Sequence, residues 1–424
     1  MTRRWILRFL IFSAGFTAGM VAFAQTTDFA LHDGDRVTFY GDSITYLRGY
    51  TDAVEEYVVT RYPAWRVEFH NAGVGGDKVS GGYAGPVDLR LDRDVFAWHP
   101  SVVTVMLGMN DSFYRAAEPG IVLSYSDGYR HLVDSLQKHL PDARITLIEP
   151  SPYDDVTRAP EQGGFNKVLV LYGNLVAQIS KEKGTQLADF NTPVTEFLQV
   201  VNQKSPDLAQ QLLPDRVHPK PAGSWIMAES LLKSWHAPSL VSSVTLDFSA
   251  KPTVVNARNA SVADIMKNKT QLRWTETEEA LPLPFPPARL DPVLALTVSL
   301  SDIVTALDQE VLKVQGLANG DYDLVIDDEE LGSFTGQQLS NGINLAMLDT
   351  PMRRQSRLVA QDIQERDALE DARFDIIYRS AEAESSPTAA ALAAAMPGAA
   401  SQIDDDARPR PHRFEIRVKN VPVH

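Results

Sequence analysis

The sequence predicts an α/β fold with a parallel β-sheet over residues 33–236, followed by a β-rich region. Short apolar runs alternate with amphipathic stretches in the first part, which is the pattern of strand–helix–strand units. Ser101–Leu107 is an almost unbroken apolar run, typical of a strand buried on both faces. After His236 the alternation changes to shorter segments separated by turn residues. These observations indicate two regions of different architecture.

The length and the composition narrow the possibilities further. The chain has 424 residues, which suggests two domains, and the absence of Cys excludes disulfides, thiolate metal sites and a cysteine nucleophile. Its 55 acidic and 40 basic residues give a net charge of −15, which argues against nucleic acid as a partner. No metal-ligand cluster, phosphate loop or dinucleotide motif stands out, so we predict neither a metal nor a cofactor.

Residues 1–24 are predicted to be a secretory signal peptide. Arg3, Arg4 and Arg8 form a basic start, an apolar run follows, and Ala22-Phe23-Ala24 is a small-x-small cleavage site. The apolar run of about 14 residues is short for a membrane span of about 20. Cleavage would move the net charge from −15 to −18 by removing the three arginines. We therefore expect an exported protein, periplasmic or extracellular, without stable membrane insertion. The lack of Cys favours a bacterial source.

The first region, residues 25–238, is expected to hold the sheet and its covering helices. Each predicted strand is a short apolar run, and each predicted helix has apolar residues at helical spacing. The predicted strands are 36–40, 65–70, 101–107, 144–148 and 186–189, and the predicted helices are 52–61, 129–139, 165–183 and 221–235.

The second region, residues 239–424, is predicted to be β-rich with one helical excursion. Asn319-Gly320 before the alternating residues 322–326 is a hairpin signal. Residues 281–287 contain four prolines and should be an extended loop. We expect a helix over about 351–375, a flexible Ala/Ser/Asp-rich segment over about 380–411 and a last strand over 413–418.

Polar residues follow three of the predicted strands. Gly41-Asp42-Ser43 ends the first strand, Asn71–Asp77 follows the second, and Gly108–Asp111 follows the third. Open parallel sheets bind ligands at this carboxyl edge, where a serine can be a nucleophile and an asparagine amide can stabilise an oxyanion. Taken singly, each is equally typical of a tight turn or a helix cap.

A fourth motif, Asp215-Arg216-Val217-His218, precedes the last helix of this region. An Asp and a His three residues apart in a loop can face the same pocket. His218 would then accept the proton of Ser43, and Asp215 would orient His218. None of the other eight histidines has an Asp three residues before it in the sequence.

Together the four motifs, GDSIT, NAGVGGD, GMND and DRVHP, resemble the blocks of the SGNH (GDSL-type) hydrolases. The resemblance covers about residues 33–236. It implies a flavodoxin-like three-layer fold and ester hydrolysis without a metal. It also implies Ser43 as the nucleophile, a triad with Asp215 and His218, and an oxyanion hole formed by Ser43, Gly76 and Asn110. Gly75 is the neighbouring alternative to Gly76.

The motifs do not specify the acyl group or the carrier of the ester. An exported member of this family without an apolar lid favours a small acyl group on a polar carrier, so we expect a carbohydrate O-acetyl esterase acting on an acylated glycan. Alternatives are a lysophospholipase or thioesterase, an acyltransferase, and a non-catalytic glycan-binding surface protein. Candidate substrate-binding residues are Asp42, Asp111, Tyr114 and Tyr153. The sequence is silent on the oligomeric state and on whether the second region binds glycan or braces the first.

Overall fold

The computed structural model describes residues 29–419 except 162, 250 and 379–385, so the predicted signal peptide lies outside the described residues. The first region is a parallel sheet of five strands in the order β2-β1-β5-β6-β7. These strands are β1 Arg36–Gly41, β2 Glu68–Gly73, β5 Val102–Met106, β6 Arg144–Glu149 and β7 Gln186–Asp189. The predicted α/β class is therefore confirmed.

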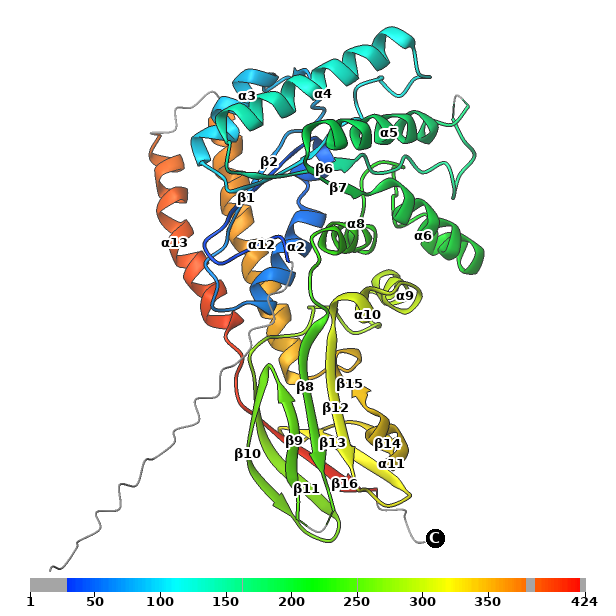
Figure 1. Cartoon of the computed structure of the whole chain (residues 1–424), viewed down its shortest axis with the longest axis vertical. Helices are drawn as coiled ribbons and strands as arrows, with labels where there is room; N and C mark the ends of the chain where they lie inside the picture. The colour runs from blue at the N-terminus through cyan, green and yellow to red at the C-terminus, as the bar shows by residue number, and fades with distance from the viewer. Residues whose placement is uncertain (1–28, 162, 250, 379–385, 420–424) are drawn as a thin grey trace, which may run out of the picture.

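Helices cover both faces of this sheet (Figure 1). Figure 1 shows α3, α4 and α5 on one face and α2, α6 and α8 on the other. The helices are α1 Ser43–Tyr46, α2 Gly49–Arg61, α3 Val87–Asp94, α4 Pro119–His139, α5 Asn166–Lys183, α6 Asn191–Lys204, α7 Pro206–Ala209 and α8 Pro221–Ser234. A small ribbon, β3 Gly81–Gly82 with β4 Gly85–Pro86, and a short 3-10 helix, Phe96–Trp98, lie in the connections. Among the described residues, no helix is both long and apolar enough to cross a membrane.

The second region contains two further sheets, in the orders β10-β11-β16-β13-β14 and β15-β12-β8-β9. Their strands are β8 Leu240–Asp247, β9 Thr253–Arg258, β10 Ala260–Lys267, β11 Gln271–Glu278, β12 Gln309–Gln315, β13 Asp321–Ile326, β14 Glu329–Thr335, β15 Ile343–Asn344 and β16 His412–Val418. The helical elements are α9 Pro292–Leu300, α10 Ile303–Leu307, α11 Gly336–Asn341, a 3-10 helix Leu345–Met347, α12 Pro351–Tyr378 and α13 Pro387–Ala407. The expected β-rich region with a long helix is confirmed.

Two expectations for this region were wrong. Residues 387–407 form helix α13, not a flexible segment, because alanine is the strongest helix former and Ser386 caps the first turn by accepting from Ala389 N. The hairpin β13–β14 turns at Asp327-Asp328, both with positive φ. Asn319-Gly320 instead joins β12 in one sheet to β13 in the other.

The two regions share buried apolar surface. Leu283 and Phe285, in the proline-containing segment 281–287, belong to the same hydrophobic cluster as the sheet of the first region. The ring of Phe285 packs edge-on against Trp225 of α8, with the centroids 4.9 Å apart. Helix α12 runs from the β-rich region along the first region, close to α2 (Figure 1). The two regions therefore share a core, and residues 281–285 are buried although they have no regular secondary structure.

Candidate active site

The turn after β1 presents Ser43 as the first residue of α1. Asp42 caps this helix, since its Oδ1 accepts a hydrogen bond from Ile44 N at 3.0 Å. Gly41 must be glycine, because a Cβ there would lie 2.1 Å from Thr45 Oγ1 and 2.9 Å from the Met106 carbonyl oxygen. The strand-to-helix turn is thus compact, and it holds Ser43 at the carboxyl edge of the sheet.

Three side chains form a hydrogen-bonded chain at this edge. Ser43 Oγ lies 2.8 Å from His218 Nε2, and His218 Nδ1 lies 2.6 Å from Asp215 Oδ2. Asp215 Oδ1 also accepts from the backbone N–H groups of Val217 and His218. Partial burial opposes ionisation of Asp215, but the hydrogen bonds from the His218 ring and these two N–H groups hold its pKa below the ordinary value. This is the arrangement of a nucleophile, a base and an orienting carboxylate.

Two loops begin next to the turn that carries Ser43. Gly41 of β1 is in register with Gly73 of β2 and Met106 of β5, so the loops that follow these strands leave the sheet on either side of Ser43. Gly76 has a φ of +73°, a conformation that favours glycine. Asn110 Nδ2 donates to the Asp77 carbonyl oxygen at 3.0 Å, which ties the Asn110 side chain to the Gly76 loop.

Comparison with known proteins points to the family that the sequence motifs resemble. Residues 39–226 match the GDSL-like Lipase/Acylhydrolase family. This part of the chain belongs to the SGNH (GDSL-type) hydrolase family. The protein is accordingly an ester hydrolase, and we call residues 39–226 the SGNH domain.

Two individual proteins illustrate the similarity. The chain is 26% identical over 217 residues to an acetylxylan esterase from Geobacillus stearothermophilus, a match that covers 47% of this chain and 93% of the relative. The solved structure of a gut microbial diltiazem-metabolizing enzyme aligns with a TM-score of 0.80 at 24% identity, covering 92% of this chain and 98% of that one. The fold of both regions, and not only of the SGNH domain, therefore recurs in a solved protein.

The four predicted substrate-binding residues divide into two kinds. Asp42 and Asp111 are buried and bonded to backbone, Asp42 to Ile44 N and Asp111 Oδ1 to Val79 N at 3.1 Å. Burial raises the pKa of each carboxyl to about 7. Their contacts are those of loop braces and not of groups exposed to a substrate.

Tyr114 and Tyr153 lie closer to where a substrate would bind. Tyr114 Oη donates to Asn110 Oδ1 at 3.2 Å, and its side chain remains 39% exposed. Tyr153 is 8% exposed and donates to Glu161, with its ring centroid 6.1 Å from that of Tyr114. The structure therefore brings Tyr114 to Asn110, the predicted oxyanion donor, and places Tyr153 next to Tyr114.

Sequence reasoning missed the exposed aromatic residue next to Tyr114. Phe113 is 60% exposed, and the Lys78 ammonium lies 5.1 Å from its ring centroid. Phe113 and Tyr114 have φ values of +53° and +59°, which are strained for bulky residues and concentrate at functional sites. No sequence signal marks such a backbone, since neither residue is Gly, Asn or Asp.

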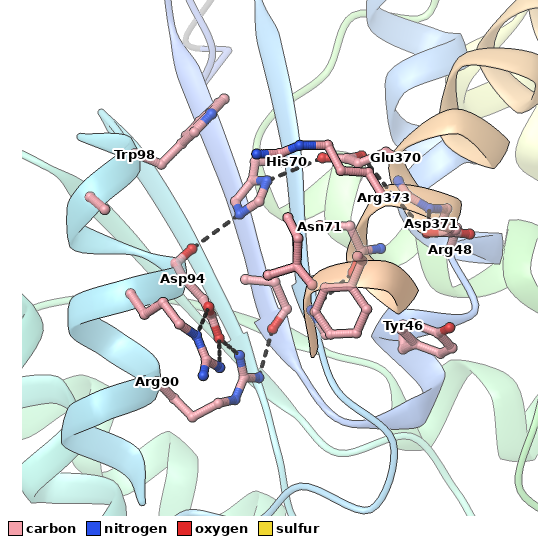
Figure 2. Close-up of a pocket in the computed structure, with 16 residues that line it drawn as sticks. Tyr46, Arg48, His70, Asn71, Arg90, Asp94, Trp98, Glu370, Asp371 and Arg373 are labelled. Atoms are coloured by element: carbon pink, nitrogen blue, oxygen red, sulfur yellow. Dashed lines mark hydrogen bonds and ion pairs between the residues drawn. The ribbon is translucent and has the colours of Figure 1, made fainter. Parts of the chain in front are cut away.

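A second missed feature is the ion-pair cluster behind the nucleophile turn, formed by Arg48 with Asp367, Glu370 and Asp371 of α12 (Figure 2). Arg48 has a φ of +64° and lies between α1 and α2. Its guanidinium is 2.7 Å from Glu370 Oε2 and 2.9 Å from Asp371 Oδ1. Figure 2 shows His70 between the Asp94 carbonyl oxygen and Glu370, on the opposite side of Glu370 from Arg48. Burial opposes ionisation of Glu370, but hydrogen bonds and charge from His70 and Arg48 lower its pKa to about 2.

Proposed function

We propose that the protein is an exported carbohydrate O-acetyl esterase. The observation that carries the catalytic part is the Ser43–His218–Asp215 chain of hydrogen bonds at the carboxyl edge of the sheet. The carbohydrate part is supported by the acetylxylan esterase that matches the SGNH domain. Export is supported by the basic, apolar and small-residue order of residues 1–24.

The proposed reaction has two steps. Ser43 Oγ attacks the ester carbonyl carbon while His218 Nε2 takes its proton, and Asp215 stabilises the imidazolium. The N–H groups of Ser43 and Gly76 and the Asn110 amide bind the negative oxygen of the tetrahedral intermediate, each contributing about 3 kcal/mol to the barrier reduction. His218 then protonates the leaving alkoxide, and water cleaves the acyl-enzyme by the same route.

Tyr114 has a supporting role in this scheme. Its hydroxyl group donates to Asn110 Oδ1, so it holds the amide with Nδ2 directed toward the Gly76 loop. The aromatic group of Tyr114, Tyr153 and Phe165, with centroids 5.2 to 6.1 Å apart, forms a wall beside the oxyanion donor. A wall of large rings at this point favours a short acyl group.

A panel of esters tests the proposal. Wild-type protein and the Ser43→Ala variant are assayed on phenyl esters of increasing acyl length and on acetylated xylo-oligosaccharides. We expect wild-type activity to be highest on acetates, and Ser43→Ala to lose activity by about a factor of 10⁴ or more. Full activity of Ser43→Ala would refute the triad, and preference for long acyl chains would refute the acetate assignment. Mass spectrometry of the protein from the periplasm or medium tests export, with a mature N-terminus at Gln25 expected.

A further inference from the structure

A cavity of about 440 Å³ lies where the N-terminal turns of α2 and α8 meet the second region. We call it the seam pocket. The SGNH domain contributes Leu47, Glu56, Lys220 and Trp225, and the second region contributes Pro284 and Ala360, among others. Its volume falls within the range of about 300–1,000 Å³ of small-molecule sites.

The seam pocket adjoins the two segments that carry the predicted nucleophile and base. Leu47 follows α1, the helix that begins at Ser43, and Pro219 directly follows His218. In serine ester hydrolysis the base returns its proton to the leaving alcohol, so the alcohol portion of the ester lies on the side of the base. Leu47 and Pro219 line the pocket, so its wall includes the chain segments next to the nucleophile and the base.

Glu56 is a buried carboxyl without a partner in this pocket. Its side chain is 7% exposed, and within the described part of the chain it makes no hydrogen bond or ion pair. Burial, with smaller contributions from the charges of Glu55 and Asp367, raises its pKa to about 8. At neutral pH it is mainly a protonated carboxyl, which both donates and accepts hydrogen bonds.

Ser224 provides a second unpartnered group at the same place. It is 1% exposed, and its hydroxyl group has no hydrogen-bond partner among the described residues. Leaving buried polar groups unpaired costs about 1–3 kcal/mol each. Ser224 Oγ is closed to solvent, so Glu56 is the unpartnered group that a ligand in this cavity would meet.

The rest of the lining defines the chemistry of that ligand. Trp225, Pro284 and Pro286 give an apolar wall, and Asp291 offsets the charge of the single cation Lys220. Burial raises the pKa of the third acidic residue, Asp52, well above its ordinary value. A neutral ring that carries hydroxyl groups and has apolar faces fits both the wall and Glu56.

We infer that the seam pocket binds the sugar part of the ester, with Glu56 hydrogen-bonded to a sugar hydroxyl group. The inference rests on the proposed carbohydrate esterase function and adds the place where the glycan lies. It also gives the second region a direct part in substrate binding, since the 281–287 segment and α12 form one side of the pocket.

Substitution of Glu56 tests the contact. Glu56→Leu is expected to raise KM for acetylated xylo-oligosaccharides about tenfold, the equivalent of one lost hydrogen bond, with kcat unchanged. Glu56→Gln, which still donates and accepts, should keep KM within about twofold of wild type. Phenyl acetate, which lacks the sugar, should be hydrolysed equally by all three proteins. Equal KM values of wild type and Glu56→Leu for the oligosaccharides would overturn the inference.

A steric variant tests the pocket independently of Glu56. Ala360→Trp on α12 should fill the cavity and raise KM for the oligosaccharides, while Ala368→Trp, at an exposed position of the same helix, should not. Melting temperatures of all variants check that each is folded. An unchanged KM in folded Ala360→Trp would contradict the inference.

Direct binding separates this inference from the proposed function. If the wild-type protein hydrolyses phenyl acetate but no acetylated oligosaccharide, the carbohydrate esterase proposal fails. Calorimetry with unacetylated xylo-oligosaccharide then decides the pocket alone. Binding that Glu56→Leu and Ala360→Trp weaken would support a sugar site, and no binding by wild type would refute it.

Discussion

The active-site edge and the interface between α2 and α12 are assembled in different ways. Within each motif of the edge the contacts are local: Asp42 bonds Ile44, and Asp215 bonds His218, each within three residues. The Ser43–His218 contact then joins two of these motifs. At the interface the contacts are between distant parts of the chain, such as Arg48 with Glu370, which are 322 residues apart. The candidate active-site residues therefore lie in short sequence motifs. The packing of α2 against α12, in contrast, depends on ion pairs between residues that are far apart in the sequence.

The difference extends to the ionisation of carboxyl groups. Asp215 at the edge and Glu370 at the interface both face donors that lower their pKa, whereas Glu56, between them, has no partner and a raised pKa. Substitutions at the edge should consequently alter catalysis more than stability. Substitutions at the interface should do the reverse.

The largest effect is expected from Asp215→Asn. An asparagine holds His218 in the wrong tautomer, so kcat on phenyl acetate should fall by about 10⁴-fold. The melting temperature should change little, because the Asp215 side chain is 58% exposed. Steady-state kinetics and thermal unfolding of the same preparation test this. A kcat within tenfold of wild type would show that the local hydrogen-bond chain is not the catalytic unit.

Arg48→Met should chiefly lower the free energy of unfolding. It leaves Asp367, Glu370 and Asp371 without their shared cation, and breaking a buried ion pair costs about 3–5 kcal/mol. Urea unfolding measures the loss. The matched control is Arg354→Met on the same helix, which breaks a more exposed pair with Glu329 and should cost at most about 1 kcal/mol. Equal losses in the two variants would refute the distinction between buried and exposed pairs.

Asn110→Ala removes one proposed oxyanion donor. We expect kcat to fall by about 10²- to 10³-fold, which corresponds to about 2.7–4 kcal/mol, while KM stays near that of wild type. Tyr114→Phe, which removes only the hydroxyl group bonded to Asn110 Oδ1, should have a smaller effect in the same direction. If Asn110→Ala changed KM and left kcat intact, Asn110 would bind substrate without stabilising the transition state.

A pH dependence of stability is expected from Glu56. Burial raises the pKa of Glu56 from 4.5 to about 8. The folded state therefore retains a proton that the unfolded state loses, and the stabilisation, complete below pH 4.5, decreases as the pH rises toward 8. Urea unfolding at about pH 5 and about pH 8 should show a smaller decrease in Glu56→Gln than in wild type. Glu196→Gln, at an exposed position of α6, is the control. Parallel decreases in Glu56→Gln and wild type would contradict this assignment.

Much of the first region could be predicted from sequence, because its signals are local. An apolar run such as 102–106 specifies a buried strand, and a motif that directly follows a strand must lie at the carboxyl edge of the sheet. Ser43 and Asn110 could be placed in this way, and His218 was found from the Asp-x-x-His spacing before α8. The same reasoning could not find Arg48, since one arginine after a short helix has no periodicity that points to α12.

In the second region, local signals were misleading. The Ala-rich segment 387–407 contains Pro397 and three Asp residues, a composition that suggests disorder, yet it forms a helix beside α12. Asn319-Gly320 is a strong hairpin signal, but here the chain passes from one sheet to another. At Asn319-Gly320 the pairing of β12 and β13 with other strands determined the structure, whereas in α13 the alanines and the Ser386 cap outweighed Pro397.

The position of β16 affects the order in which the molecule can fold. The last strand of the chain lies in the middle of its sheet, paired with β11 on one side and β13 on the other. Until residues 412–418 leave the ribosome, β11 and β13 each expose an unpaired edge, and exposed edges promote aggregation. β11 and β13 therefore become members of one sheet only through a strand that is synthesised well after both of them.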